Sequence, residues 1–96
     1  MKAHELLSDC SKWTRGCYSR NRNGTPCASD SPHACQWCAM GAIIKCYPNK
    51  DDFAQAVNAA QETAKRLYDE NIISLNDTTV SGAYDMVLAV LKEADV

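Results

Sequence analysis

Hydrophobic side chains recur at helical spacing in four parts of the chain, which are separated by polar or turn-forming residues. The predicted helices run over residues 2–13, 32–46, 51–71 and 81–94. The third has one apolar stripe, formed by Phe53, Val57, Ala60, Ala64, Leu67 and Tyr68. The fourth has another, formed by Ala83, Met86, Val87, Val90, Leu91 and Ala94. Because each stripe needs a partner surface, we expect the helices to pack around a common core.

The second predicted helix is apolar on nearly every side, which is typical of a buried helix. Pro32 suits its first turn, where a backbone N–H is not needed, and Pro48 lies beyond its end. Gly41 lies in the middle, where glycine costs a helix about 1 kcal/mol relative to alanine. Such a glycine indicates a close helix crossing or an approaching ligand.

Glycine, proline, serine and asparagine are concentrated in residues 16–33, a composition typical of a loop. A loop of this length in a compact domain is usually functional or mobile. Its Asn23-Gly24 pair is compatible with a short hairpin. Further on, residues 72–75 predict a short apolar connection and residues 76–79 a polar turn. The whole pattern predicts an all-α fold, a small domain of about four helices with a long N-terminal loop.

Length and composition limit the classes of protein to which the chain can belong. Its 96 residues predict a single domain, residues 1–96, with one modest core. A hydrophobic content of 46% excludes a disordered chain, and no apolar run approaches the ~18 residues that span a bilayer. Residues 1–9 contain two acids and no long apolar stretch, so they do not predict a signal peptide. We therefore expect a cytoplasmic protein with no membrane partner.

The six cysteines all fall between Cys10 and Cys46. Their share of the chain is below the ~8–10% that is typical of disulfide scaffolds. Cytoplasmic thiols stay reduced, and free cysteines are among the most buried residue types. We therefore expect mostly reduced thiols, with Cys35, Cys38 and Cys46 buried in the second helix.

Charge is divided unevenly along the chain. Residues 1–50 carry a formal charge of +4 and residues 51–96 a charge of −6, which leaves a net charge of −2. Such polarity suits packing of the two halves or head-to-tail association of copies, so a homo-oligomer is one expectation. The alternative is two ordinary solvated faces. The isoelectric point near 5.5 argues against nucleic acid as a partner.

A basic and aromatic stretch supplies the main candidate binding residues, which are Trp13, Arg15, Tyr18, Arg20 and Arg22. Such a mixture binds phosphates or an acidic protein surface through charge and stacking. Its alternative role is a partly buried tryptophan flanked by solvated arginines. Trp37, in the second predicted helix, and Asn76-Asp77, before the last, complete the candidate binding face. Asn76-Asp77 has a structural alternative as a turn that leads the chain into that helix.

Three stretches of the chain resemble a family of small bacterial and phage proteins of unknown function. They are Trp13–Arg20 followed by Gly24, the run Trp37-Cys38-Ala39-Met40-Gly41-Ala42-Ile43, and Leu75-Asn76-Asp77. The resemblance covers about residues 5–94. Leu75 departs from the family's pattern, in which a tryptophan is common before Asn-Asp. The resemblance implies a phage or bacterial origin and no established activity.

Cysteine chemistry offers a different class of function. Cys38 lies near the start of a predicted helix, and a helix N-terminus lowers the pKa of a thiol. His33 is the candidate base and Asp77 or Asn76 the candidate orienting group of a cysteine-dependent hydrolase. The apolar sequence around Cys38 favours a core role instead.

Zinc is a second alternative. Cys27, His33, Cys35 and Cys38 have the ligand types of a structural zinc site, and two of them form a Cys-x-x-Cys pair. The chain lacks the second ligand pair that such sites usually have, and the pair falls in a predicted helix. We therefore expect no cofactor, with a zinc-stabilised module as the alternative.

Together these patterns favour a binding protein over an enzyme. The expected partner is another protein, and in a phage the chain would act as an inhibitor directed at the host. The cysteine-dependent hydrolase and the zinc-stabilised module are the alternatives.

Overall fold

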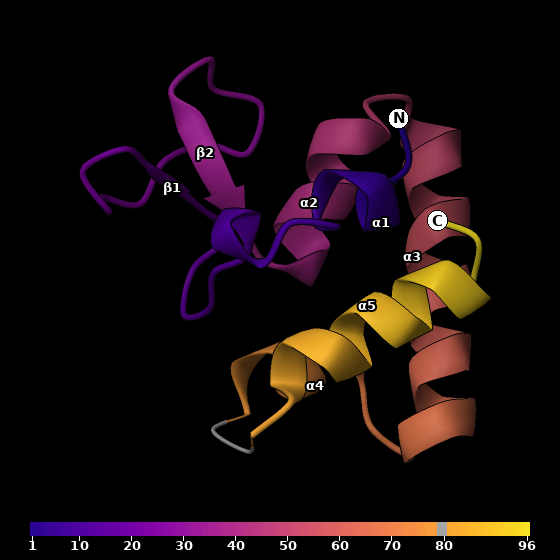
Figure 1. Cartoon of the computed structure of the whole chain (residues 1–96). Helices are drawn as coiled ribbons and strands as arrows, with labels where there is room; N and C mark the ends of the chain where they lie inside the picture. The colour runs from indigo at the N-terminus through magenta and orange to yellow at the C-terminus, as the bar shows by residue number, and fades with distance from the viewer. Residues whose placement is uncertain (79–80) are drawn as a thin grey trace.

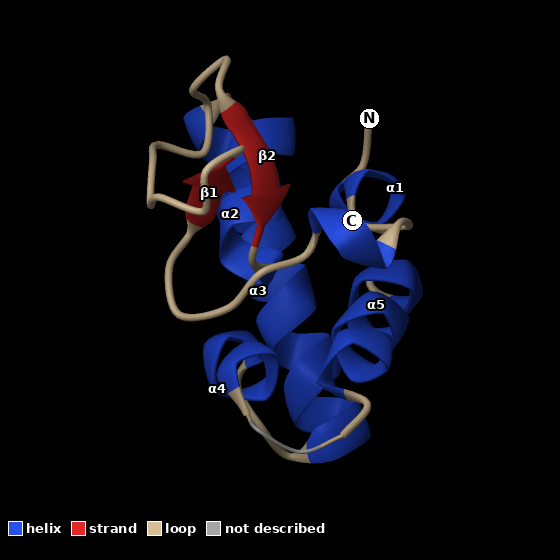
Figure 2. Ribbon diagram, turned by 60° about the vertical axis from the view of Figure 1, so that its left-hand side comes forward, coloured by secondary structure: helices blue, strands red, loops and turns tan. Residues whose placement is uncertain are grey.

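The computed structural model describes residues 1–78 and 81–96, and the fold in these residues is mixed α/β. Five helices are present there: α1 (Ala3–Leu6), α2 (Ala39–Cys46), α3 (Lys50–Tyr68), α4 (Ile72–Asp77) and α5 (Ala83–Glu93). Between α1 and α2 the chain forms a 3-10 turn, η1 (Cys10–Lys12), and a two-stranded sheet of β1 (Ser19–Asn21) and β2 (Ala34–Trp37). The prediction of an all-α fold is therefore wrong. Figures 1 and 2 show the sheet standing to one side of the helices.

The error lies in the second predicted helix, which is a strand followed by a shorter helix. β2 pairs antiparallel with β1, with Ser19 opposite Trp37 and a register shift after Arg20. The Trp37 carbonyl also accepts a hydrogen bond from Thr14 N at 3.1 Å, so β2 has backbone partners on both sides. A short continuous apolar run suits a buried strand as well as a buried helix, and periodicity alone does not separate them.

Gly41, in the first turn of α2, lies very close to the chain entering β1. A Cβ atom on Gly41 would lie 2.0 Å from the carbonyl oxygen of Tyr18. The same oxygen accepts a hydrogen bond from Cys38 N at 3.0 Å. The crowding at Gly41 therefore comes from the chain entering β1, and not from the helix crossing or the ligand that the sequence suggested.

Asn23-Gly24 lies in a turn whose two arms pair briefly, so the possible short hairpin is present but is limited to one antiparallel bridge, with Cys27 N donating to Ser19 O at 3.0 Å. Gly24 N donates to Asn21 O at 2.9 Å, and Asn21 N donates to Thr25 O at the same distance. Beyond the turn, Arg20 and Pro26 form a single isolated bridge. The strand that pairs with β1 comes later, at residues 34–37.

The two long amphipathic helices are confirmed, with small changes at their ends. α3 starts after Asn49, whose side chain accepts hydrogen bonds from Asp51 N and Asp52 N. The predicted N-terminal helix is shorter and is divided into α1 and η1. Asn76 and Asp77 belong to α4 and not to a turn, whereas Thr79 of the predicted turn lies outside the described residues.

The short helix α4 occupies the predicted apolar connection. Asn71 caps it by accepting from Ser74 N at 2.8 Å. Ile72 N donates to the Gln61 side chain at 2.8 Å, and the Ile72 and Leu75 side chains are buried. Six residues are too few for a helical period to be recognised, so the sequence gives only an apolar segment.

The helices share one core, in which the largest fully buried apolar side chains are Leu7, Ile43, Ile72, Leu91, Val87 and Val90. The two ends of the chain meet beside it (Figure 1). Tyr47 Oη donates to Val96 O at 2.9 Å, and Lys2 forms an ion pair with Asp95. The core therefore contains residues from both ends of the chain.

Candidate functional site

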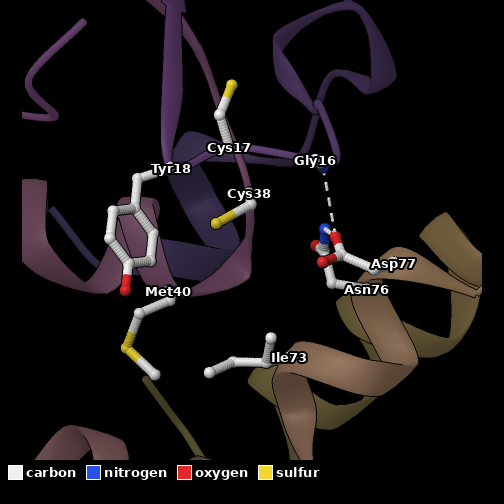
Figure 3. A pocket seen from close by; sticks show the side chains of 8 residues that line it. All are labelled: Gly16, Cys17, Tyr18, Cys38, Met40, Ile73, Asn76 and Asp77. Carbon is white, nitrogen blue, oxygen red and sulfur yellow. Dashed lines mark hydrogen bonds between the residues drawn. The ribbon is translucent and has the colours of Figure 1, made fainter. Parts of the chain in front are cut away.

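A pocket of about 340 Å³ opens between the segment before β1, the start of α2 and helix α4 (Figure 3). It is lined by Gly16, Cys17, Tyr18, Cys38, Met40, Ile73, Asn76 and Asp77. Its wall is mainly apolar, yet Tyr18 is 56% exposed and Ile73 is 46% exposed. Apolar concavities with exposed large side chains at the rim are typical of binding sites.

Asn76 holds the pocket together. Its Oδ1 accepts hydrogen bonds from Trp13 Nε1 at 2.7 Å and from Ala39 N at 2.9 Å. Its Nδ2 donates to Thr14 O and to Asp77 Oδ1, at 3.2 Å in each case. These four bonds use the whole capacity of a side-chain amide. Asn76 is 1% exposed, so it positions the walls and keeps no polar group for a ligand.

Asp77 lies at the open edge of the same pocket. Its Oδ1 accepts from Gly16 N at 3.3 Å as well as from Asn76 Nδ2 (Figure 3). Its side chain is exposed. Three ion pairs form within the described residues, and Asp77 belongs to none of them.

Arg15 and Arg20 use their guanidinium groups in hydrogen bonds within the chain. Arg15 Nη1 donates to Thr78 O at 2.6 Å, and its guanidinium carbon lies 4.8 Å from the centroid of the Trp13 ring. Arg20 donates three hydrogen bonds, to the Thr14 hydroxyl and to the carbonyls of Arg15 and Gly24. These contacts brace the segment before β1.

The remaining residues of the predicted binding face lie apart from the pocket. Trp37 is buried, and its Nε1 donates to Ser29 O at 3.0 Å. Arg22 is exposed and lines a separate polar depression together with His33 and Cys35. Of the predicted binding residues, the structure therefore brings Tyr18, Asn76 and Asp77 together in the pocket.

Cys38 is the N-cap of α2, and its sulfur points into the pocket (Figure 3). The sulfur accepts a hydrogen bond from Gly41 N at 3.2 Å. Burial is the largest influence on its pKa and raises it; the negative charge of Asp77 acts in the same direction. The amides of Gly41 and Met40 oppose this increase in pKa without cancelling it. Near neutral pH the group is therefore a thiol and not a thiolate.

His33 does not share the pocket with Cys38. It precedes β2 and lines the separate polar depression. A strand advances about 3.3 Å per residue, so the four steps from Ala34 to Cys38 span roughly 13 Å. The predicted hydrolase set is thus divided, with Cys38 and Asp77 in the pocket and the candidate base elsewhere.

The predicted zinc ligands are divided in the same way. Within residues 1–78 and 81–96, no three His, Cys, Asp or Glu side chains gather so as to hold a metal ion. All six cysteines lie in that part of the chain as free thiols, and Cys38 alone among them is buried. The predicted burial of Cys35 is wrong, because β2 presents this residue on its exposed face, and Cys46 is half-buried.

Sequence comparison places the chain in a family. The sequence pattern of one family matches residues 1–95. The chain belongs to DUF6197, a family of unknown function. No curated protein and no solved structure matches it. The resemblance to a family of unknown function is confirmed to that extent.

Four further pocket residues of this DUF6197 chain were not predicted from the sequence, namely Gly16, Cys17, Met40 and Ile73. Ile73 follows the buried Ile72 on a helix too short to show its own period. Met40 lies inside the run that was interpreted as uniformly buried.

In the described part of the chain, no helix is long and apolar enough to cross a membrane.

Proposed function

We propose that this DUF6197 chain works by binding a protein partner, and that the pocket receives an apolar side chain of that partner. The observation that carries the proposal is the exposure of Tyr18 and Ile73 at the rim of an apolar pocket. Its volume lies near the lower end of the range of ligand sites, ~300–1,000 Å³, which suits one or two side chains. The proposal extends to a small phage or bacterial protein that inhibits a cytoplasmic partner by occupying it; that extension rests on the sequence and the resemblance.

A preformed pocket favours binding because little has to be ordered when the partner arrives. Asn76 fixes three segments around the pocket through four hydrogen bonds. The raised pKa of Cys38 and the position of His33 outside the pocket give the hydrolase alternative no comparable support.

The test is a selection of random displayed peptides on the immobilised wild-type chain, followed by affinity measurements on purified variants. We expect enriched peptides to lose at least about tenfold in affinity for Ile73→Asp, because the new carboxylate would be desolvated by an apolar side chain. Leu67→Asp is the matched control, since Leu67 lies at the end of α3 and is 41% exposed, close to the 46% of Ile73.

Circular dichroism verifies that both variants keep the wild-type fold. Loss for Ile73→Asp together with unchanged affinity for Leu67→Asp supports the proposal. Peptides that bind both variants equally well, or the absence of any enriched peptide, would overturn it.

A further inference from the structure

We infer that the partner segment carries a lysine or arginine beside its apolar side chain, and that Asp77 binds this cation. The inference rests on the proposed function and adds the chemistry of the ligand. It begins from the pocket's charge: of the eight residues that line it, Asp77 is the one with a formal charge.

One oxygen of the Asp77 carboxylate is engaged, which fixes the orientation of the group. Oδ1 accepts from Gly16 N at 3.3 Å and from Asn76 Nδ2 at 3.2 Å. No described residue donates a hydrogen bond to Oδ2. A carboxylate accepts at both oxygens, so Oδ2 offers an acceptor to an incoming donor.

Asp77 forms no ion pair with the basic side chains that the structure describes. Within residues 1–78 and 81–96, no Lys, Arg or His nitrogen lies within 4.0 Å of it. Arg15, the basic residue closest to Gly16 in sequence, donates to Thr78 O and lies over the Trp13 ring instead. A cation from outside would therefore have no ion pair among the described residues to displace.

The apolar lining next to Asp77 favours a basic over an acidic residue of the partner at this position. Tyr18 and Met40 lie across the pocket from Asp77, and Ile73 lies between them and Asp77, one turn earlier on α4 (Figure 3). An apolar side chain held between them would exclude water, and a charge pair at its edge is stronger where the local dielectric is lower. An acidic residue in the same place would face an unpaired carboxylate, which disfavours it.

The selected peptides provide the first test, since lysine or arginine is expected within two positions of their apolar anchor. The best peptide is then synthesised in three forms that have lysine, norleucine or glutamate at that position. We expect lysine to bind about 5- to 20-fold tighter than norleucine at low salt, with glutamate the weakest. The advantage of lysine should shrink as salt is raised from 50 to 500 mM.

Asp77→Asn is the decisive variant, because an amide oxygen can still accept from Gly16 N and Asn76 Nδ2 while the charge is removed. The lysine advantage should fall below about twofold in Asp77→Asn and persist in Asp85→Asn, an exposed aspartate in the first turn of α5 that serves as the control.

The outcomes separate the two proposals. If lysine and norleucine bind alike, or if Asp77→Asn leaves the lysine advantage intact, the inference is overturned. If Ile73→Asp still abolishes binding in that case, the proposed function stands without it. If no peptide depends on Ile73, the proposed function fails, and the inference fails with it.

Discussion

Asn76 Oδ1 accepts a hydrogen bond from Trp13 Nε1 at 2.7 Å, which joins two residues 63 positions apart. The same oxygen accepts from Ala39 N, so the N-terminal segment, α2 and α4 meet at one atom. The pocket forms where these three segments meet. Its shape therefore depends on a buried amide whose polar groups are all engaged within the chain.

Replacing Asn76 should be costly for stability. Asn76→Ala leaves the Trp13 indole N–H, the Ala39 N–H and the Thr14 carbonyl without this partner. Buried groups without partners cost about 1–3 kcal/mol each where water does not reach them, so we expect the free energy of unfolding to fall by about 2–4 kcal/mol. Urea denaturation followed by tryptophan fluorescence measures the change. Asn58→Ala, at an exposed position of α3, is the control and should change the free energy of unfolding by less than about 0.5 kcal/mol. Equal effects of Asn76→Ala and Asn58→Ala would contradict the assigned role of Asn76.

Gly41→Ala tests the close approach between α2 and the chain entering β1. The added Cβ would lie 2.0 Å from Tyr18 O, a backbone atom that cannot rotate away. We expect a loss of about 2 kcal/mol or more, with shifted amide resonances around Tyr18 and Cys38. Gly24→Ala is the comparison, because Gly24 has a φ of +81° and no atom within 4 Å of the added carbon. Its loss should come from backbone strain alone, about 1 kcal/mol, and leave Tyr18 unperturbed. A stable Gly41→Ala with wild-type resonances would show that the approach is looser than the structure has it.

The sequence predicts those elements whose signal is local and long enough to repeat. Asn49 caps helix α3 with its own side chain, and Ala60 and Ala64 of the predicted apolar stripe are buried, whereas Leu67 and Tyr68 at its end are exposed. Helix α5 presents Val87, Val90 and Leu91 to the core at the predicted spacing. Both helices were identified from the sequence because propensity and periodicity agree over many residues, although the buried face of α3 also includes Ala56 and Thr63.

The errors occur where tertiary contacts decide the structure. Residues 34–37 form a strand because β1 and Thr14 N supply backbone partners, which lie far away in the sequence. Once that segment is extended, His33 is carried away from Cys38, and the predicted nearness of the two is lost. Asn76 was identified as a candidate, but three of its four partners come from two distant segments, around Trp13-Thr14 and at Ala39, which no local pattern connects to it.

The alkaline stability of the protein should depend on Cys38. Burial raises the pKa of this thiol in the folded state, whereas the unfolded thiol titrates near its ordinary value, ~8.5. As the pH rises above the unfolded value, the unfolded state releases its proton first and gains stability. The contribution of the buried thiol is therefore complete below about pH 8 and is lost as the pH rises towards the folded pKa.

Cys38→Ser isolates this effect, because serine does not titrate in this range and its Oγ can accept from Gly41 N as an N-cap. Cys46 and Tyr47 also have raised pKa values through burial, but they are present in both proteins. Urea midpoints between pH 7 and pH 10 should show the wild type losing stability relative to Cys38→Ser. Parallel pH profiles would mean that the Cys38 thiol titrates alike in the folded and unfolded states.

The amide of Ala39 reports directly on the joint at Asn76. As the first residue of α2, Ala39 has no earlier helical carbonyl to bind, and its N–H donates to Asn76 Oδ1 in a buried position. Hydrogen exchange followed by NMR should therefore show Ala39 protected to nearly the level of the core. Lys50, the exposed first residue of α3, should exchange rapidly and is the reference.

In Asn76→Ala the protection of Ala39 should fall by more than that of Val87 or Val90 in the core, because a local bond is lost in addition to global stability. Rapid exchange of Ala39 in the wild type would contradict the bond, and an equal fall at all three amides would mean that Asn76 contributes to global stability without holding the start of α2.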